Sequence, residues 1–309
     1  MSRRCIAGTC LALASSAELK TQNNWNARYT PALNIDSHQH FWRYDPHRDG
    51  WITDEMAALK RDFLPEHLFS ELGGSGIDAS VAVQADQSER ETLFLLDCAA
   101  QHQTIAGVVG WVDLRSSRLP ERLAFFSQFK KLRGFRHIVQ AEPDDTFLLR
   151  EDFCRGIGCL REFGFTYDIL IYPKQLAAAC AFVDKFPKQP FVIDHLAKPQ
   201  IRDRAIEPWR SQIRAIAAHP NVCCKLSGLI TEADWRNWSV DDCRPYLDVV
   251  VDAFGVERLM FGSDWPVCLL AGTYQQVRDV IGNYTQDFSA ADRAKICGAN
   301  AAKFYGLPV

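Results

Sequence analysis

The stretch LNIDSHQHFW occupies residues 33–42 and has the length and apolar content of a buried β-strand. Side chains two positions apart on a strand point to the same side, so Asp36, His38, His40 and Trp42 are expected to share one face. Two imidazoles that converge at the carboxyl end of a strand suit metal ligation or stabilisation of an oxyanion. The stretch therefore predicts both the first strand of a sheet and part of a functional site.

Outward from this stretch, short apolar runs alternate with amphipathic stretches, a pattern typical of repeated βα units. The further strands are expected at residues 79–85, 105–113, 132–140, 166–172, 191–196, 222–229 and 259–265. Helices are expected between them at residues 89–101, 119–130, 174–186, 209–218 and 244–254. Eight such units over about 275 residues predict a single (β/α)8 TIM barrel.

The alternative α/β architecture is a doubly wound open sheet. It usually carries a glycine-rich phosphate loop after its first strand, and the sequence has none there. The first strand is instead followed by a long insertion, residues 43–77, which is expected to overhang the barrel mouth as a partial lid or to be a structural decoration. At the other end of the chain, Ser289 and Asp292 form a capping-box pattern for the last helix, and Gly306 follows as its stop.

Residues 1–32 are expected to form a poorly ordered leader before the barrel domain at residues 33–309. The leader resembles a short secretory signal, because Arg3 and Arg4 precede an apolar stretch, but Gly8 and Thr9 interrupt that stretch. The eleven cysteines form no C-x-x-C pair and several fall in patterned helix or strand segments, which indicates reduced thiols. A cytoplasmic location is therefore predicted, with export through the leader as the alternative.

Composition narrows the class of partner. The chain has 309 residues, 47% of them hydrophobic, and a net charge of -3 without long runs of one sign. This gives no electrostatic reason to expect nucleic acid or a membrane surface as a partner. A small-molecule partner is therefore predicted, while the oligomeric state is not indicated by the sequence.

Two more candidate residues follow later strands. His195 lies at the end of the sixth strand and Asp264 at the end of the eighth. In a closed barrel the eighth strand adjoins the first, and catalytic groups gather at the carboxyl ends of the strands. His38, His40, His195 and Asp264 are therefore expected to meet at one rim, as candidate catalytic residues.

Four motifs carry a resemblance to a known family. They are IDSHQHFW at residues 35–42, GFRH at 134–137 with the following QAEPDD at 140–145, DHLAKP at 194–199, and FGSDWP at 261–266. In this order they resemble the amidohydrolase superfamily, in particular its amidohydrolase-related branch with sugar-lactone and muconolactone-type lactonases. The resemblance runs from about residue 34 to the C-terminus. It is more specific for the branch than for the substrate.

The resemblance implies that His38 and His40 occupy first-strand metal-ligand positions and that Asp264 handles the proton of the attacking water. His195 corresponds to the sixth-strand histidine of the superfamily. The fifth strand, however, lacks the histidine found in fuller metal sites. Either a zinc ion held by His38, His40 and Asp264 activates water, or the histidines bind the carbonyl oxygen directly and Asp264 acts as base without a metal. The missing histidine favours the version that requires no cofactor.

Substrate contacts are expected from side chains near the strand ends. Trp42 and Trp265 flank the catalytic candidates and offer flat apolar faces to a sugar-derived ring. Polar contacts are expected from Gln84, Arg136, His137, Asp168 and Lys198. Arg136 and His137 are adjacent on one strand and cannot both point inward, and the sequence does not say which one does.

The leading hypothesis is hydrolysis of a sugar-acid lactone resembling L-fuconolactone. A muconolactone-type substrate is the near alternative, although it asks for more positive charge than Arg136 and Lys198 obviously provide. A metal-dependent decarboxylase or hydratase is a second alternative, disfavoured by the missing fifth-strand histidine. A barrel that binds a metabolite without turnover is the third, disfavoured because all four catalytic candidates are present.

Overall fold

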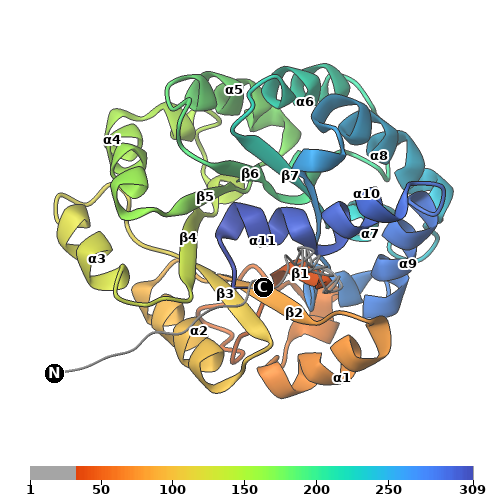
Figure 1. Cartoon of the computed structure of the whole chain (residues 1–309), viewed down its shortest axis with the longest axis horizontal. Helices are drawn as coiled ribbons and strands as arrows, with labels where there is room; N and C mark the ends of the chain where they lie inside the picture. Colours follow the sequence, from red (N-terminus) through yellow and green to blue (C-terminus); the bar gives the residue numbers. More distant parts are fainter. Residues whose placement is uncertain (1–32, 309) are drawn as a thin grey trace, which may run out of the picture. The chain divides into compact units, whose positions relative to one another are not determined.

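The structure, a computed structural model, describes residues 33–308 (Figure 1). Its centre is one eight-stranded parallel sheet in which the strands follow each other in sequence order. The strands are β1 (Ile35–Gln39), β2 (Ala79–Val83), β3 (Ile105–Gly110), β4 (Leu132–His137), β5 (Thr166–Ile169), β6 (Phe191–Ile193), β7 (Val222–Leu226) and β8 (Leu259–Phe261).

The sheet closes because β1 returns to lie beside the chain that leaves β8. Gln39 and Trp265 form a parallel bridge. The amide of His40 donates to the carbonyl of Trp265 at 2.7 Å, and the amide of Asp264 donates to the carbonyl of His38 at 2.8 Å. The (β/α)8 barrel is therefore confirmed, and the open-sheet alternative is wrong.

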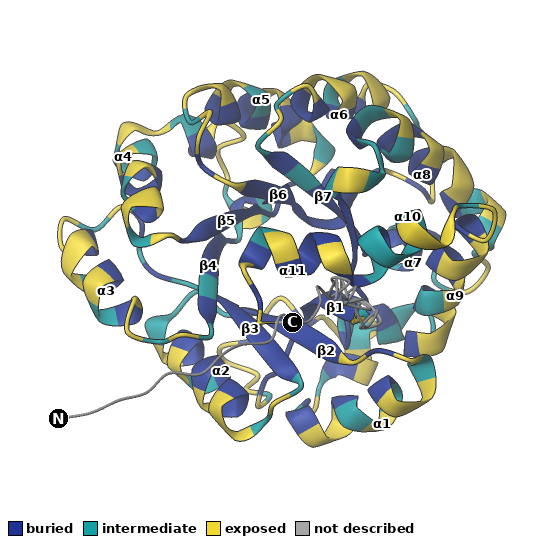
Figure 2. Cartoon of the chain, viewed as in Figure 1, coloured by how far each residue is buried: buried dark blue, intermediate teal, exposed yellow. Residues whose placement is uncertain are grey.

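Helices surround the sheet, with their apolar faces against it and their polar faces outward (Figures 1 and 2). They are α1 (Pro65–Ser75), α2 (Glu89–Gln101), α3 (Leu119–Phe126), α4 (Glu151–Leu160), α5 (Leu176–Asp184), α6 (Trp209–Ala217), α7 (Leu229–Glu232), α8 (Val240–Phe254), α9 (Tyr274–Tyr284), α10 (Ala290–Ala294) and α11 (Asn300–Tyr305). The sequence located both ends of α2, but it placed the end of α3 and the start of α8 four residues too late. Helix α8 begins at Val240 because Ser239 caps it.

The strands are shorter than the apolar runs that predicted them, most clearly β6 and β8. Beyond Ile193 the chain enters a turn, Asp194–Ala197, and beyond Phe261 it enters the turn that carries Asp264. Periodicity could not locate these ends, because the turn residues are as buried as the strands themselves. Both departures from the sheet occur where the candidate catalytic residues lie.

The insertion at residues 43–77 is partly a barrel helix. Its last third is α1, and only residues 43–64, with a short 3-10 turn at Asp54–Leu59, form the extended loop after β1. The expected overhang is therefore shorter than predicted. A lid function for this loop stays a prediction.

Helix α11 covers the amino-terminal ends of the strands, which we call the barrel floor (Figure 1). Ala301, Ala302 and Tyr305 pack against inward-facing apolar residues of the strands, among them Val81 and Met260. The predicted termini of this last segment are confirmed, since the Ser289 hydroxyl accepts from the amide of Asp292 and Gly306 adopts a φ of 58°. The floor is thus closed by packing, and the carboxyl ends of the strands remain open to a ligand.

Within residues 33–308, no helix is long and apolar enough to cross a membrane. The nine cysteines in this part of the chain are all free thiols, as expected. The predicted leader at residues 1–32 and its signal-like stretch lie outside the described residues. The division into leader and barrel domain therefore stays a prediction.

Candidate active site

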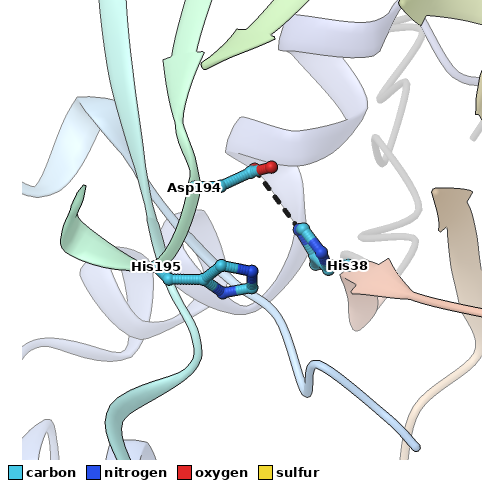
Figure 3. Close-up of side chains that lie close together, drawn as sticks. All are labelled: His38, Asp194 and His195. Carbon is cyan, nitrogen blue, oxygen red and sulfur yellow. Dashed lines mark ion pairs between the residues drawn. The ribbon is translucent and has the colours of Figure 1, made fainter. Parts of the chain in front are cut away.

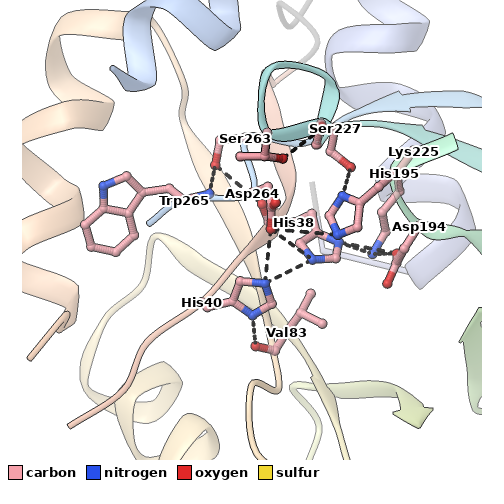
Figure 4. A network of polar contacts seen from close by, with 12 residues as sticks. His38, His40, Val83, Asp194, His195, Lys225, Ser227, Ser263, Asp264 and Trp265 are labelled. Atoms are coloured by element: carbon pink, nitrogen blue, oxygen red, sulfur yellow. Dashed lines mark hydrogen bonds and ion pairs between the residues drawn. The ribbon is translucent and has the colours of Figure 1, made fainter. Parts of the chain in front are cut away.

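Three histidines and one aspartate converge at the carboxyl end of the barrel (Figure 4). The Oδ1 atom of Asp264 lies 3.3 Å from His40 Nε2, 3.8 Å from His38 Nε2 and 3.7 Å from His195 Nε2. The two Nε2 atoms of His38 and His40 are 3.2 Å apart. All four side chains are almost completely buried. The geometry therefore assembles the four residues that the sequence singled out.

Asp264 reaches this position through an unusual backbone. Its φ is +57°, a left-handed conformation that is unfavourable for a residue with a Cβ atom. The preceding residue, Ser263, is fixed by the buried carboxylate of Asp36, which accepts from the Ser263 amide at 2.9 Å and from its hydroxyl at 2.5 Å. Asp36 also accepts from the Tyr274 hydroxyl at 3.0 Å. The first strand thus holds the turn after the last strand.

His195 begins a turn of left-handed helix. Residues His195, Leu196, Ala197 and Lys198 have φ angles of 53°, 54°, 57° and 52°. Each left-handed residue costs roughly 1–2 kcal/mol relative to the right-handed conformation, so the surrounding structure must stabilise this turn. The indole of Trp209 donates to the carbonyl of Leu196 at 2.7 Å, and the Lys198 amide donates to the carbonyl of His195 at 2.7 Å.

Gly228 makes room for the imidazole of His195. A Cβ atom at this position would lie 2.8 Å from His195 Cβ and 2.9 Å from its Cγ and Nδ1 atoms, and Gly228 has a φ of +69°. The neighbouring residue, Ser227, makes a polar contact with the same ring, because its hydroxyl lies 2.8 Å from His195 Nδ1. The ring is therefore held on one side by close packing and on another by a hydrogen bond.

Hydrogen bonding determines which nitrogen of His40 carries the proton. His40 Nδ1 is 2.7 Å from the carbonyl oxygen of Val83, which can only accept, so Nδ1 is the protonated nitrogen of the neutral ring. The lone pair of Nε2 then faces the Asp264 carboxylate. A lone pair and a carboxylate oxygen 3.3 Å apart repel unless a cation or a proton lies between them.

The ionisation of these groups follows from burial and mutual proximity. Burial opposes the charge of Asp264, but His195, His40 and His38 outweigh it and lower the pKa of its carboxyl below the ordinary value. Burial lowers the pKa of His195 to about 4 and that of His38 well below its ordinary value. At neutral pH the Asp264 carboxylate therefore lies beside the neutral imidazoles of His38 and His195, which is the protonation state that binds metal ions.

The donor set fits a metal ion. Ligand atoms of His38, His40 and Asp264 all lie within 4.8 Å of one another, and so do those of His38, Asp194 and His195. Figure 3 shows the second group, in which Asp194 Oδ1 lies 3.3 Å from His38 Nδ1. The first group directs two imidazole nitrogens and one carboxylate oxygen to a common centre, the usual set for zinc with an open position.

A buried ion network lies beneath the histidines, and its central member is Lys225. The ammonium lies 2.6 Å from Asp168 Oδ2, 2.9 Å from Asp194 Oδ1 and 3.1 Å from His38 Nδ1. Arg136 completes the network with a 2.9 Å contact to Asp194 Oδ2. Burial opposes ionisation of Asp194, but Lys225, His38 and Arg136 hold the pKa of its carboxyl well below the ordinary value.

Lys225 and Asp194 were missed as site residues by the sequence reasoning. Lys225 stands in the buried strand VCCKL, and a lysine inside an apolar strand was the available signal. Asp194 was seen only as part of the DHLAKP motif. Both lie at the carboxyl half of the barrel interior, where they orient His38.

A cavity of about 440 Å³ opens above the four central residues. His40, His195 and Asp264 line it, and so do the predicted substrate contacts Trp42, Arg136 and Lys198. The loop after β1 forms a further wall of the cavity. The sequence analysis named no individual residue of this wall, which consists of His47, Arg48, Asp49, Gly50 and Trp51. The cavity has the size and mixed polar and aromatic lining of a small-molecule site.

The structure resolves the choice between Arg136 and His137. Arg136 points into the barrel, where its guanidinium contacts Gln84 and Asp194 and lies 3.2 Å from His38 Nε2. His137 points outward. Its ring stacks on Phe147 and its Nε2 atom is 2.6 Å from Glu142, so the expectation of a substrate contact from His137 is wrong.

Three other expected substrate contacts do not line the cavity. Gln84 is fully buried and binds the guanidinium of Arg136, so it positions that cation. Asp168 lies deeper, paired with Lys225. Trp265 packs edge-to-face against Phe41 and Phe63, with its ring directed away from the histidines (Figure 4). The sequence indicates that these residues lie near strand ends, but it does not indicate how far along the barrel axis each side chain lies.

The site combines a His-x-His strand, a histidine after β6 and an aspartate after β8 in an eight-stranded barrel. This combination defines a class of hydrolase, and comparison with known proteins agrees with that class. The profile of the family described as Amidohydrolase matches residues 35–307. The chain therefore belongs to the amidohydrolase family. The recognition made from the four motifs is confirmed.

Two curated relatives from Burkholderia carry the same activity in their names. The L-fucono-1,5-lactonase of Burkholderia multivorans is 44% identical over 291 residues, covering 90% of this chain and 97% of the relative. The L-fucono-1,5-lactonase of Burkholderia ambifaria is 39% identical over 278 residues, covering 88% and 95%. A crystal structure of an amidohydrolase from Burkholderia multivorans with bound zinc is 44% identical, with a TM-score of 0.87, covering 90% of this chain and all of the other.

Proposed function

We propose that the protein is a lactonase that opens the ring of a six-membered sugar-acid lactone of the L-fucono-1,5-lactone type. The observation that carries this proposal is the Asp264 carboxylate, held among three imidazoles at the base of a cavity sized for one sugar ring. The names of the two Burkholderia relatives support the same substrate class.

In this reaction the Asp264 carboxylate accepts a proton from the water that attacks the lactone carbonyl. The carbonyl oxygen gains negative charge in the tetrahedral intermediate, and the cations Arg136 and Lys198 line the cavity where that charge develops. Collapse of the intermediate breaks the bond to the ring oxygen. The departing alkoxide takes the proton back from Asp264, which gives a ring-opened hydroxy acid.

The site also fits a divalent metal ion, which His38, His40 and Asp264 would hold. Such an ion would polarise the carbonyl and lower the pKa of bound water. The orientation of His40 supports a metal, because Nδ1 faces the carbonyl of Val83 and Nε2 is left directed at the Asp264 carboxylate, where one ion could bind both atoms. The geometry therefore favours the metal-assisted reaction over the version without a cofactor that the missing fifth-strand histidine suggested.

Recognition of the sugar ring is assigned to the loop after β1 and to the β6 turn. Trp42 lines the cavity beside Trp51, whose indole is 42% exposed and packs edge-to-face on it. The ion pairs of Arg48 with Asp49 and of Lys198 with Glu232 offer charged groups to hydroxyls. A cytoplasmic location completes the proposal, supported by the free thiols of the barrel.

The experiment is a panel assay of lactone hydrolysis, followed by proton release with a pH indicator. The panel contains L-fucono-1,5-lactone, other aldonolactones and a muconolactone, and the control protein is Asp241→Asn, which changes an exposed carboxylate outside the cavity. Turnover of L-fucono-1,5-lactone above the other lactones is expected for both proteins. Decarboxylation or hydration without lactone turnover would refute the proposal.

A further inference from the structure

A second cavity, of about 540 Å³, lies at the barrel floor, at the opposite end of the barrel from the histidines. The α3–β4 connection, the start of β5 and helix α11 form its walls. This cavity belongs to no part of the proposed reaction. We call it the floor cavity.

The floor cavity is lined by three cations and no acidic side chain. The cations are Lys130, Arg133 and Lys303. Among residues 33–308, none of these three side chains forms an ion pair or donates a hydrogen bond, and the Nε atom of Arg133 is buried without a partner. Their neighbour Lys131 differs, because its ammonium donates to three main-chain carbonyls. The three cations are therefore free to bind an anion.

Aromatic and other apolar side chains stand beside these cations in the mixed lining of the floor cavity. Phe129, Phe163, Phe165, Pro190 and Phe304 all line the floor cavity. Aromatic side chains beside unpaired cations fit an organic anion with a ring or other apolar part better than an inorganic ion, because that part would be removed from water against them.

The leader of this chain is a poor occupant for a cationic cavity. Residues 1–32 contain Arg3, Arg4, Lys20 and Arg28 against a single acidic residue, Glu18. A segment with this positive balance is repelled by three further cations. The charge of the cavity therefore points to a separate small molecule.

One lining residue connects the floor cavity to the candidate active site. The hydroxyl of Tyr305 donates to Asp168 at 2.7 Å, and the same carboxylate oxygen lies 2.6 Å from Lys225. Lys225 in turn lies 3.1 Å from His38 Nδ1. Three consecutive buried contacts thus run along the barrel axis from the floor cavity to a catalytic candidate.

We propose that the floor cavity binds a small organic dianion with an apolar part, and that this anion acts as an effector of the site at the other end of the barrel. The effect on catalysis rests on the proposed lactonase function, whereas binding does not. A protein that binds the anion but turns over no lactone would therefore point to an error in the proposed function alone.

The test uses the full chain and phenyl phosphate as the probe, with phenol and inorganic phosphate for comparison. Binding is measured by calorimetry at low ionic strength, where exposed charges are least screened. The variant is the double substitution Lys130→Gln with Lys303→Gln, at two exposed positions. The matched control is Arg90→Gln with Arg236→Gln, which removes two exposed charges outside the cavity.

We expect phenyl phosphate to bind more tightly than phosphate or phenol, and the double variant to lose about fivefold or more in affinity while the control keeps it. We also expect phenyl phosphate to change kcat/KM about fivefold or more, and Tyr305→Phe to abolish that change while binding persists. Binding that is absent or unaffected by the double variant would overturn the proposal. So would an effect on turnover that survives in the double variant, since it would arise in the catalytic cavity. Affinity that appears only after residues 308 and 309 are removed would assign the floor cavity to the chain's own terminus.

Discussion

Replacement of Gly228 by alanine tests how closely catalysis depends on the position of His195. The new Cβ atom would lie 2.8–2.9 Å from three atoms of His195, a distance that real Cβ contacts do not tolerate, so the imidazole must move. The φ of +69° adds roughly 1–2 kcal/mol of backbone strain for an L side chain. A displacement of a few tenths of an ångström also stretches the 2.8 Å contact between His195 Nδ1 and the Ser227 hydroxyl.

Gly164 supplies the matched control, because its φ of 74° and ψ of 18° are close to the 69° and 4° of Gly228, and a Cβ atom there would meet nothing within 4 Å. Urea unfolding should show that both Gly228→Ala and Gly164→Ala lose roughly 1–2 kcal/mol of stability. Only Gly228→Ala should also lose activity, by about 10- to 100-fold in kcat/KM, since small displacements of catalytic groups are costly. Full activity in a folded Gly228→Ala protein would show that the position of His195 does not matter to the reaction.

Three further outcomes are expected. Lys225→Met should destabilise the protein by about 3–5 kcal/mol in urea unfolding, because it leaves the buried Asp168 carboxylate without a cation and Asp194 with Arg136 alone. A second substitution, Asp168→Asn, should recover part of that loss. Burial raises the pKa of Glu91 from 4.5 to about 7, so the folded state favours the protonated carboxyl. The free energy of unfolding should therefore fall by about 2–3 kcal/mol as the pH rises from 4.5 to 7. Glu91→Gln should remove this pH dependence. Chelation should abolish lactone hydrolysis and added zinc should restore it, with metal content measured in parallel; an unchanged rate in metal-free protein would contradict the metal-assisted reaction.

The sequence was sufficient for the barrel and for the four converging residues because both follow from local periodicity and from the closure rule of an eight-stranded barrel. Alternation along residues 33–42 places His38 and His40 together, and the rule that β1 adjoins β8 brings Asp264 to them. Neither inference requires knowledge of side-chain depth.

The remaining features depend on position along and around the barrel axis, which periodicity does not encode. Three of the four residues in the left-handed turn at His195–Lys198, namely Leu196, Ala197 and Lys198, have no special preference for positive φ, so the turn has no clear local signature. The choice between Arg136 and His137 depended on the exact register of β4 relative to β5. Asp168 could be placed on β5, but only packing shows that it pairs with Lys225 below the cavity and does not reach it.

The most direct test of the central claim compares kcat and KM of Asp264→Asn with those of the unaltered protein on L-fucono-1,5-lactone. If Asp264 takes the proton of the attacking water, kcat should fall by about 100- to 10,000-fold, the contribution typical of a general base, while the protein stays folded. An Asp264→Asn protein that retains kcat within a few-fold would contradict the account.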